Sequence, residues 1–349
     1  MQKYFWVLLL CAITLSVGAQ TDTVKVKSTD ASQDADIAYN NGISLFTNKK
    51  YSEALSEFNK AILLKSDFEK AYYNRSIVHI ELKQPENALA DLNKCIELNP
   101  AADNAYYERA KLKQAAKDIK GAEQDYSKVI ELRPLYEQAF YYRGVIRFDN
   151  KDYQGAIADF DKAIQLKPDY AYAYNDRASA KKQLEDYDGA IADYKKALIA
   201  NPDMYFTYNN LASTKRKKGD FRGAIVDYSS ALKIKKDDYA LYNNLGSAYY
   251  DAGNYEEAMS MFNMALALNP QYAFALNNRA AAKYKLKDYK GAIDDYNKAI
   301  SINKQYADAY VNRGIAKEML RDTDGACKDW EIAESSGSIQ AKMYMQDCK

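Results

Sequence analysis

Small and apolar residues return along the chain with a period of 34 residues. A large, mostly aromatic residue stands four positions after each of nine regularly spaced alanines, and a small residue stands twelve positions before it. The alanines are Ala54, Ala88, Ala122, Ala156, Ala190, Ala224, Ala258, Ala292 and Ala326. A period of this length predicts tandem repeats, each burying its apolar face against its neighbours, instead of one globular core.

Numbering each of these alanines as position 20 divides the chain into nine units. They cover residues 35–68, 69–102, 103–136, 137–170, 171–204, 205–238, 239–272, 273–306 and 307–340. Position 16 is Asp or Asn in seven units, which suits the N-cap of a helix, and position 32 is Pro in five units, where that helix should end. Each unit therefore predicts a helix A over positions 1–14 and a helix B over positions 17–30.

This arrangement resembles the tetratricopeptide repeat family, whose 34-residue units have small residues at positions 8 and 20, an aromatic residue at 24 and Pro at 32. The resemblance covers residues 35–340. It implies an all-α fold, a right-handed superhelical solenoid of nine repeats, whose concave groove binds peptides. Residues 341–349 continue the pattern, because Tyr344 follows Tyr310 by 34 residues. We expect them to form a C-terminal capping helix.

The polar pattern departs from the family where helix A should meet helix B. Positions 7, 11 and 23 are usually apolar, as in the seventh repeat, but six other repeats have Arg at 7, a basic residue at 11 and Asp at 23. The predicted pairs are Arg75 and Asp91, Arg109 and Asp125, Arg143 and Asp159, Arg177 and Asp193, Arg279 and Asp295, and Arg313 and Asp329. Since positions 7 and 11 are one turn apart, both bases can address one carboxylate. We interpret these residues as a structural charge ladder; a catalytic or anion-binding role is the alternative.

Positions 2, 5, 9 and 12 of helix A are left as a free stripe, which we predict to line the peptide-binding groove. Position 5 carries Tyr39, Tyr73, Tyr107 and Tyr141, then Asn175, Asn209, Asn243 and Asn277, and position 6 carries Asn210, Asn244, Asn278 and Asn312. An Asn amide both donates and accepts, so such a row could pair with the backbone of an extended peptide. Alternatively, the asparagines satisfy backbone groups or neighbouring helices.

Composition narrows the function classes. Lys and Arg number 49 against 48 Asp and Glu, which argues against a nucleic-acid partner. With 14 Gly and a single His among the residues, no phosphate-binding loop, His-built metal site or Ser/His/Asp set can be assembled, so we expect no enzyme, no cofactor and no metal. The strongest basic patch, Lys215 to Lys218 with Lys181 and Lys182, is interpreted as a solvated helix end; contact with an acidic peptide or lipid is the alternative.

The amino terminus has the pattern of a secretory signal. Residues 1–19 combine Lys3, an apolar stretch over residues 4–15 and small residues up to Ala19. The apolar stretch is shorter than the ~20 residues that span a bilayer, so we expect cleavage, no integral span in the mature chain, and export to the periplasm or extracellular space. A retained membrane anchor is the alternative. Residues 20–34 are polar and are expected to be a flexible linker.

Two cysteines fall at the carboxyl end of the repeat pattern. Cys327 is at position 21 of the last helix B, and Cys348 is at the small position 8 of the capping segment, which packs on that helix. We predict a disulfide between them, since export would reach an oxidising compartment; two unrelated thiols are the alternative. Cys95 is expected to be a buried free thiol.

Together these patterns predict an exported, non-catalytic scaffold that binds extended segments of a protein partner along the groove. Two alternatives stay open at this point. One is a glycan-binding module that uses an exposed tyrosine row, and the other is a membrane-anchored assembly factor.

Overall fold

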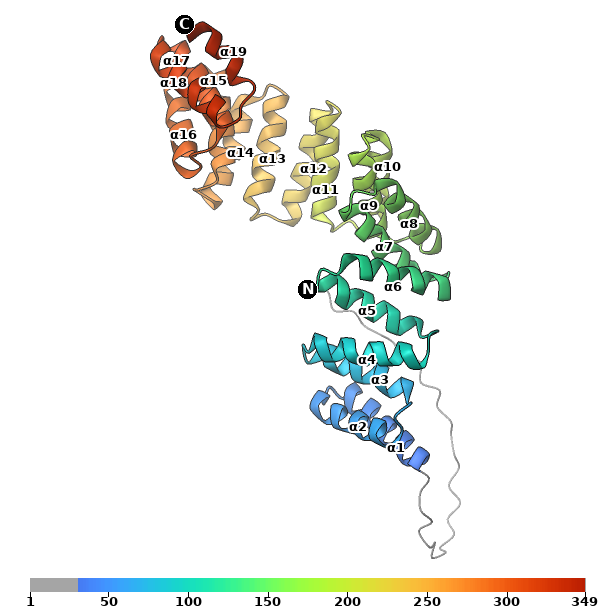
Figure 1. Ribbon diagram of the computed structural model, residues 1–349. Coiled ribbons are helices and arrows are strands. Elements are labelled where there is room, and N and C mark those ends of the chain that lie inside the picture. The colour runs from blue at the N-terminus through green and yellow to red at the C-terminus, as the bar shows by residue number, and fades with distance from the viewer. Residues whose placement is uncertain (1–30, 349) are drawn as a thin grey trace, which may run out of the picture. The chain divides into compact units, whose positions relative to one another are not determined.

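The computed structural model describes residues 31–348, and all regular structure in this range is helical (Figure 1). The helices are α1 (Ala31–Thr47), α2 (Tyr51–Leu64), α3 (Glu69–Glu81), α4 (Pro85–Leu98), α5 (Asp103–Ala115), α6 (Ile119–Leu132), α7 (Glu137–Asp149), α8 (Tyr153–Leu166), α9 (Ala171–Gln183), α10 (Tyr187–Ala200), α11 (Tyr205–Lys217), α12 (Phe221–Ile234), α13 (Tyr239–Asp251), α14 (Tyr255–Leu268), α15 (Ala273–Lys285), α16 (Tyr289–Ile302), α17 (Ala307–Met319), α18 (Thr323–Ser335), α19 (Ala341–Tyr344) and the 3₁₀ helix η1 (Met345–Cys348). Odd-numbered helices up to α17 are the predicted A helices, and even-numbered helices are the B helices.

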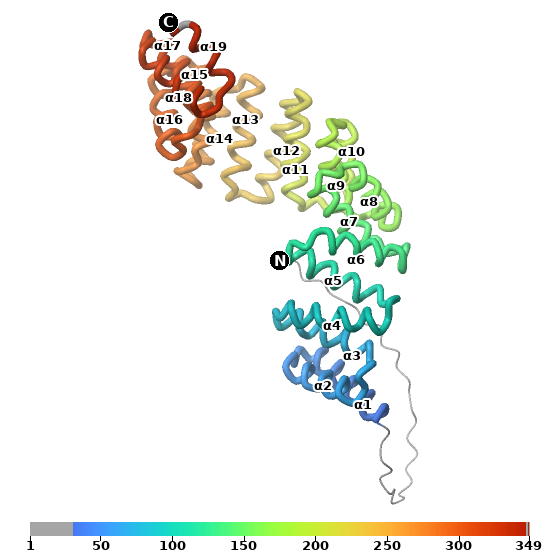
Figure 2. Tube along the Cα trace, viewed as in Figure 1, coloured from blue at the N-terminus to red at the C-terminus, as the bar shows by residue number. Residues whose placement is uncertain are grey.

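The chain divides into two compact units, one ending at Ala105 and one beginning at Tyr106. In the first, α1 packs on α2, α2 on α3 and α3 on α4. In the second, the same succession of neighbours runs from α6 to α18, and it can be followed along the Cα trace in Figure 2. Each unit is thus a stack of consecutive helix pairs, as the all-α prediction requires.

Three predicted boundaries need correction or lie outside the described residues. Helix α1 begins at Ala31, so the last four residues of the predicted linker 20–34 are helical, with Asp34 in the first turn, where a negative charge is favoured. The predicted capping helix over residues 341–349 is one short α-helix followed by a 3₁₀ turn. The predicted signal peptide, residues 1–19, lies outside the described residues.

In six repeats helix B begins at an aspartate whose carboxylate accepts a hydrogen bond from the backbone N–H three residues later. Six of the seven predicted N-caps do this: Asp118, Asp152, Asp186, Asp220, Asp288 and Asp322. Asn254 is also the N-cap residue of its helix, as predicted, but its side chain makes no such bond. The residue before the N-cap is left-handed, with φ of 64° at Lys117 and 85° at Gly219, which ends helix A and starts the turn.

Close approach of helices A and B follows from the small residue at position 8. Gly144 lies against the ring of Phe160, and a Cβ added there would come within 2.8 Å of the ring. Phe160 and its equivalents Phe58, Tyr126, Tyr194, Tyr228, Phe262, Tyr296 and Trp330 are buried. These rings, with the alanines at position 20, form the core of each pair.

The predicted ladder residues form bidentate ion pairs. Arg177 Nε and Nη2 donate to the two oxygens of Asp193 at 2.8 and 2.6 Å, and Lys181 Nζ donates to the same carboxylate at 2.7 Å. The other five arginines pair in the same way with Asp91, Asp125, Asp159, Asp295 and Asp329. Because these aspartates are buried, each carboxylate depends on its basic partners.

Arginine at position 7 also reaches a third helix, which the sequence analysis did not anticipate. Its Nη1 donates to position 25 of the preceding helix B, as from Arg279 to Asn263 at 2.7 Å and from Arg313 to Asn297 at 2.6 Å. The guanidinium is covered by the position-4 ring, with Arg313 5.2 Å from the centroid of Tyr310. One arginine therefore joins two successive repeats.

The sixth repeat has an incomplete ladder. Leu211 replaces the arginine, leaving Asp227 with Lys215 at 2.6 Å, and Asp227 Oδ2 makes no hydrogen bond of good geometry. Burial raises the pKa of Asp227, and Lys215 only partly opposes this shift. At Asp295 burial acts in the same direction, but the hydrogen bonds and charges of Arg279 and Lys283 outweigh it and lower the pKa. Asp227 and Asp295 are thus at the same repeat position, but the pKa of the first is raised and the pKa of the second is lowered.

A disulfide closes the carboxyl end of the stack. Cys327 in α18 is bonded to Cys348 in η1, with Cα atoms 5.7 Å apart. Tyr344 stacks on Trp330 at a centroid distance of 5.0 Å. In the chain-entropy account, a bridge over about 20 residues contributes roughly 3 kcal/mol, so the bond holds the short cap on the last helix pair. Cys95 is a buried free thiol, as expected.

A double-mutant cycle on one ladder pair should show that the two residues contribute to the free energy of unfolding as a pair. Arg177→Ala and Asp193→Ala should each destabilise, because each leaves a buried charge, while the double variant should lose less than the sum by about 1–3 kcal/mol. The exposed pair Lys94 and Glu97 serves as a control, with expected coupling below about 0.5 kcal/mol. The measurement is the free energy of unfolding from urea titrations; additive losses at Arg177 and Asp193 would refute the ladder.

The two contrasting aspartates should respond differently to amidation and to pH. The stabilisation from Asp295 is present above the ordinary pKa of 3.8 and is lost as pH falls through its lowered pKa. That of Asp227 belongs to its protonated form, so it is present below 3.8 and is lost as pH rises through its raised pKa. At pH 7, Asp295→Asn should therefore cost about 3 kcal/mol, whereas Asp227→Asn should leave stability unchanged or raise it. Equal losses in thermal unfolding would contradict this account.

Candidate functional site

Consecutive A helices meet through a line of hydrogen bonds from position 5 of one repeat to position 6 of the next. In the first unit, Asn74 Nδ2 donates to the Tyr39 hydroxyl at 3.0 Å. In the second unit, the Tyr141 hydroxyl donates to Asp176 at 2.8 Å, and amide-to-amide bonds follow. These run from Asn244 to Asn209 at 3.1 Å, from Asn278 to Asn243 at 3.0 Å and from Asn312 to Asn277 at 3.4 Å. We call this line the 5/6 contact.

The asparagines at position 5 do not form the free row that the sequence predicts. Asn175, Asn243 and Asn277 are 5–7% exposed. Asn175 accepts from the Thr207 hydroxyl at 2.9 Å and donates to Asp176 at 2.8 Å. Asn209 and the position-6 residues Asn210, Asn244, Asn278 and Asn312 are half-buried. The structure favours the alternative, in which the amides satisfy neighbouring helices.

Nor is the tyrosine half of position 5 an exposed row. The ring of Tyr39 lies 5.0 Å from that of Phe68, and Tyr141 lies 4.9 Å from Tyr170. Tyr107, which is 5% exposed, lies among the rings of three other tyrosines. Burial raises the pKa of both Tyr107 and Tyr141, and Tyr73 is half-buried. These rings pack between repeats, so they do not form the exposed tyrosine row on which the glycan-binding alternative depends.

We call the surface lined by positions 2, 5, 9 and 12 of the A helices the A-helix face. Position 2 of this face carries three aromatic residues that the sequence analysis missed, of which Tyr172 and Phe206 are half-buried. Tyr172 and Phe206 stack across two repeats at 6.2 Å with an interplanar angle of 24°. Phe274 is 56% exposed and touches the rings of Tyr272 and Tyr306. Position 2 is in the predicted free stripe and is aromatic only in these three repeats, which is the signal that could have found them.

The other end of the same face is polar and basic. Lys182, at position 12, donates to the hydroxyl of Ser213, at position 9 of the next repeat, at 3.0 Å. Burial lowers the pKa of Lys182, and the nearby Lys217 ammonium adds to the shift. Arg216 pairs with Asp251 at 2.5 Å. In repeats 5 and 6, each A helix therefore presents four kinds of side chain in order along this face: an aromatic ring at position 2, an asparagine at position 5, a serine at position 9 and a basic residue at position 12.

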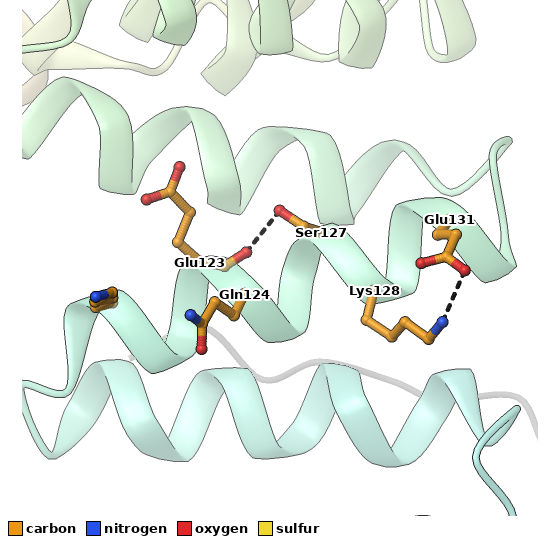
Figure 3. Close-up of a pocket in the computed structure, with 6 residues that line it drawn as sticks. Glu123, Gln124, Ser127, Lys128 and Glu131 are labelled. Carbon is orange, nitrogen blue, oxygen red and sulfur yellow. Dashed lines mark hydrogen bonds and ion pairs between the residues drawn. The ribbon is translucent and has the colours of Figure 1, made fainter.

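A separate hollow lies on α6, and Figure 3 shows its lining side chains. The lining residues are Lys120, Glu123, Gln124, Ser127, Lys128 and Glu131. Within it Lys128 pairs with Glu131 at 2.7 Å, and Ser127 donates to the Glu123 carbonyl at 2.8 Å (Figure 3). All six side chains come from one helix and the charged pair is satisfied locally, so we do not assign a ligand to the hollow.

The described residues offer little for metal or nucleophilic chemistry. In residues 31–348, no three His, Cys, Asp or Glu side chains are grouped to hold a metal ion. His79 Nδ1 is hydrogen-bonded to Gln84 at 2.8 Å, and the Cys95 thiol donates to Glu69 while burial raises its pKa. Within that same range, no helix combines the length and apolar character needed to cross a bilayer. The A-helix face is the strongest candidate site that the structure presents.

Comparison with known proteins agrees with the repeat pattern. Tetratricopeptide repeat models match residues 69–101, 103–134, 137–170, 171–204 and 238–305, and a TPR repeat model matches residues 212–253. No curated protein matches the chain.

Several solved structures are similar. A tetratricopeptide repeat protein from Parabacteroides merdae is 20% identical, with 70% of this chain and 97% of that chain covered and a TM-score of 0.57. The Cut9–Hcn1 assembly of the APC/C is 16% identical, with 90% and 76% covered and a TM-score of 0.53. MamA is 30% identical, with 47% and 96% covered and a TM-score of 0.43. From the repeat matches along its length, the chain belongs to the tetratricopeptide repeat family.

Proposed function

We propose that this protein is a non-catalytic scaffold that binds extended segments of a partner protein on its A-helix face. The observation that carries the proposal is the half-buried ring pair Tyr172 and Phe206, which stacks across two repeats on a face that the 5/6 contact holds in place. Aromatic residues are enriched at protein interfaces, and side chains that are already ordered lose less conformational entropy when a partner binds.

The spacing of this face suits an extended segment that crosses the A helices. Tyr172 and Phe206 repeat at 6.2 Å, close to the ~6.6 Å between alternate residues of a β-strand. Side chains on one edge of an extended segment could therefore contact successive repeats. Peptide backbone would lie over the small position-9 residues Ser179, Ser213 and Ser247, which leave room for it.

We propose export to the periplasm or extracellular space. The disulfide between Cys327 and Cys348 supports this location, because such bonds persist in oxidising compartments. The signal peptide proposed for residues 1–19 lies outside the described residues, and so does the segment on which the membrane-anchor alternative depends. The glycan alternative loses its basis, since Tyr39, Tyr107 and Tyr141 are packed between helices.

An array of peptides and glycans, incubated with the purified mature chain, tests the proposal. We expect peptide binding, and Phe206→Ala should weaken the affinity for the selected peptide at least tenfold, as for a residue near the centre of an interface. The control is Ile199→Ala on helix α10, which removes an 84% exposed apolar side chain from outside the A-helix face and should change nothing. Binding to glycans alone, or equal losses in both variants, would contradict the proposed function.

A further inference from the structure

Two ammonium groups without an acidic partner lie between α9 and α11. Lys182 Nζ is hydrogen-bonded only to the neutral Ser213 hydroxyl, at 3.0 Å, and Lys217 is near enough to lower its pKa. Within residues 31–348 neither lysine forms an ion pair. We call Lys182, Lys217 and the Ser213 hydroxyl the two-lysine site.

The surrounding bases differ in this respect. Lys181 pairs with Asp193 at 2.7 Å, Lys215 with Asp227 at 2.6 Å and Arg216 with Asp251 at 2.5 Å, and Lys218 pairs with Asp188. The basic run that stands out in the sequence is therefore mostly neutralised. What remains is a local positive charge at one place on the A-helix face.

Within the part of the chain that the structure describes, the positive charges of Lys182 and Lys217 are not balanced by a paired carboxylate. Partial burial and a like charge both disfavour the ammonium of Lys182, and an anion placed beside both lysines would offset both effects. Ser213 adds a donor, because a hydroxyl that accepts from Lys182 keeps its own proton for another acceptor. A carboxylate could thus receive hydrogen bonds from two ammonium groups and a hydroxyl.

The rings and the lysines lie on opposite edges of the same face. Tyr172 and Lys182 are ten residues apart in α9, or about 15 Å along the helix axis. Successive side chains of an extended chain point to opposite sides. A segment lying between these edges would therefore direct alternate side chains toward the rings and toward the lysines.

We propose that the two-lysine site binds an Asp or Glu side chain of the partner, within an extended segment that alternates acidic residues with apolar or aromatic ones. The inference rests on the proposed function and specifies the chemistry of its partner. The site itself suits one carboxylate, because it offers two ammonium groups and one hydroxyl, and the neighbouring bases Arg216 and Lys218 are already paired with Asp251 and Asp188.

Isothermal titration of the mature chain tests this proposal with two matched peptides. Both have twelve residues, are acetylated and amidated, and have Gly-Ser flanks; one has Glu-Phe-Glu-Phe-Glu at its centre and the other has Gln in place of each Glu. We expect the Glu peptide to bind at least tenfold more tightly. Lys182→Gln and Lys217→Gln should each remove most of that difference, and added salt should reduce it.

The matched control is Lys285→Gln. Lys285 is exposed at the last residue of α15, the same repeat position as Lys217 in α11, so the variant makes an equal charge change elsewhere. It should leave the difference between the two peptides intact. Thermal unfolding of each variant shows that the repeats stay folded.

Three outcomes would overturn the proposal. Equal affinity for the Glu and Gln peptides would mean that the two-lysine site does not bind a carboxylate. The proposed peptide binding would not be contradicted by that result. Tighter binding of a twelve-nucleotide oligothymidylate than of the Glu peptide would assign the lysines to phosphate. Binding of neither peptide would also refute the proposal, and the peptide array then separates the cases, because the proposed function fails only if no peptide on it binds.

Discussion

In six of the nine repeats, the bidentate ion pair between Arg at position 7 and Asp at position 23 is the interaction on which the packing of helix A against helix B depends. Its aspartate is buried, so the charge is tolerable only while the guanidinium and the base at position 11 hold it. Because the same arginine reaches the preceding helix B, as Arg279 reaches Asn263, it fixes both the pairing within a repeat and the register between repeats. Apolar packing alone would allow more sliding.

That fixed register creates the A-helix face. With the A helices held side by side, position 5 of one repeat meets position 6 of the next, and the amides of Asn243 and Asn278 bond to each other. Side chains at positions 2 and 12 then remain at the edges of the face, as rings such as Phe206 and bases such as Lys182. The packing of the A helices thus determines which polar side chains bond to a neighbouring helix and which can bind a partner.

The sequence predicts the elements well because each depends on local chemistry that recurs every 34 residues. Helix bounds, the six aspartate N-caps, the Arg and Asp pairs and the Cys327–Cys348 bond all follow from positions within one repeat or at its immediate neighbour. The free stripe was predicted less well, since helical periodicity gives the direction of a side chain but not the distance to the next A helix. The pairing of Tyr39 with Asn74, or of Asn243 with Asn278, is a contact between repeats that periodicity alone does not reveal.

Site-specific photo-crosslinking tests most directly whether the A-helix face is the binding surface. A benzophenone amino acid placed at Ser213 or Ser247, on A helices, is compared with one at Ile199 or Lys233, on B helices. With the array-selected peptide, the account predicts crosslinks at Ser213 and Ser247 and none above background at Ile199 and Lys233. Crosslinks confined to the B-helix positions would contradict it.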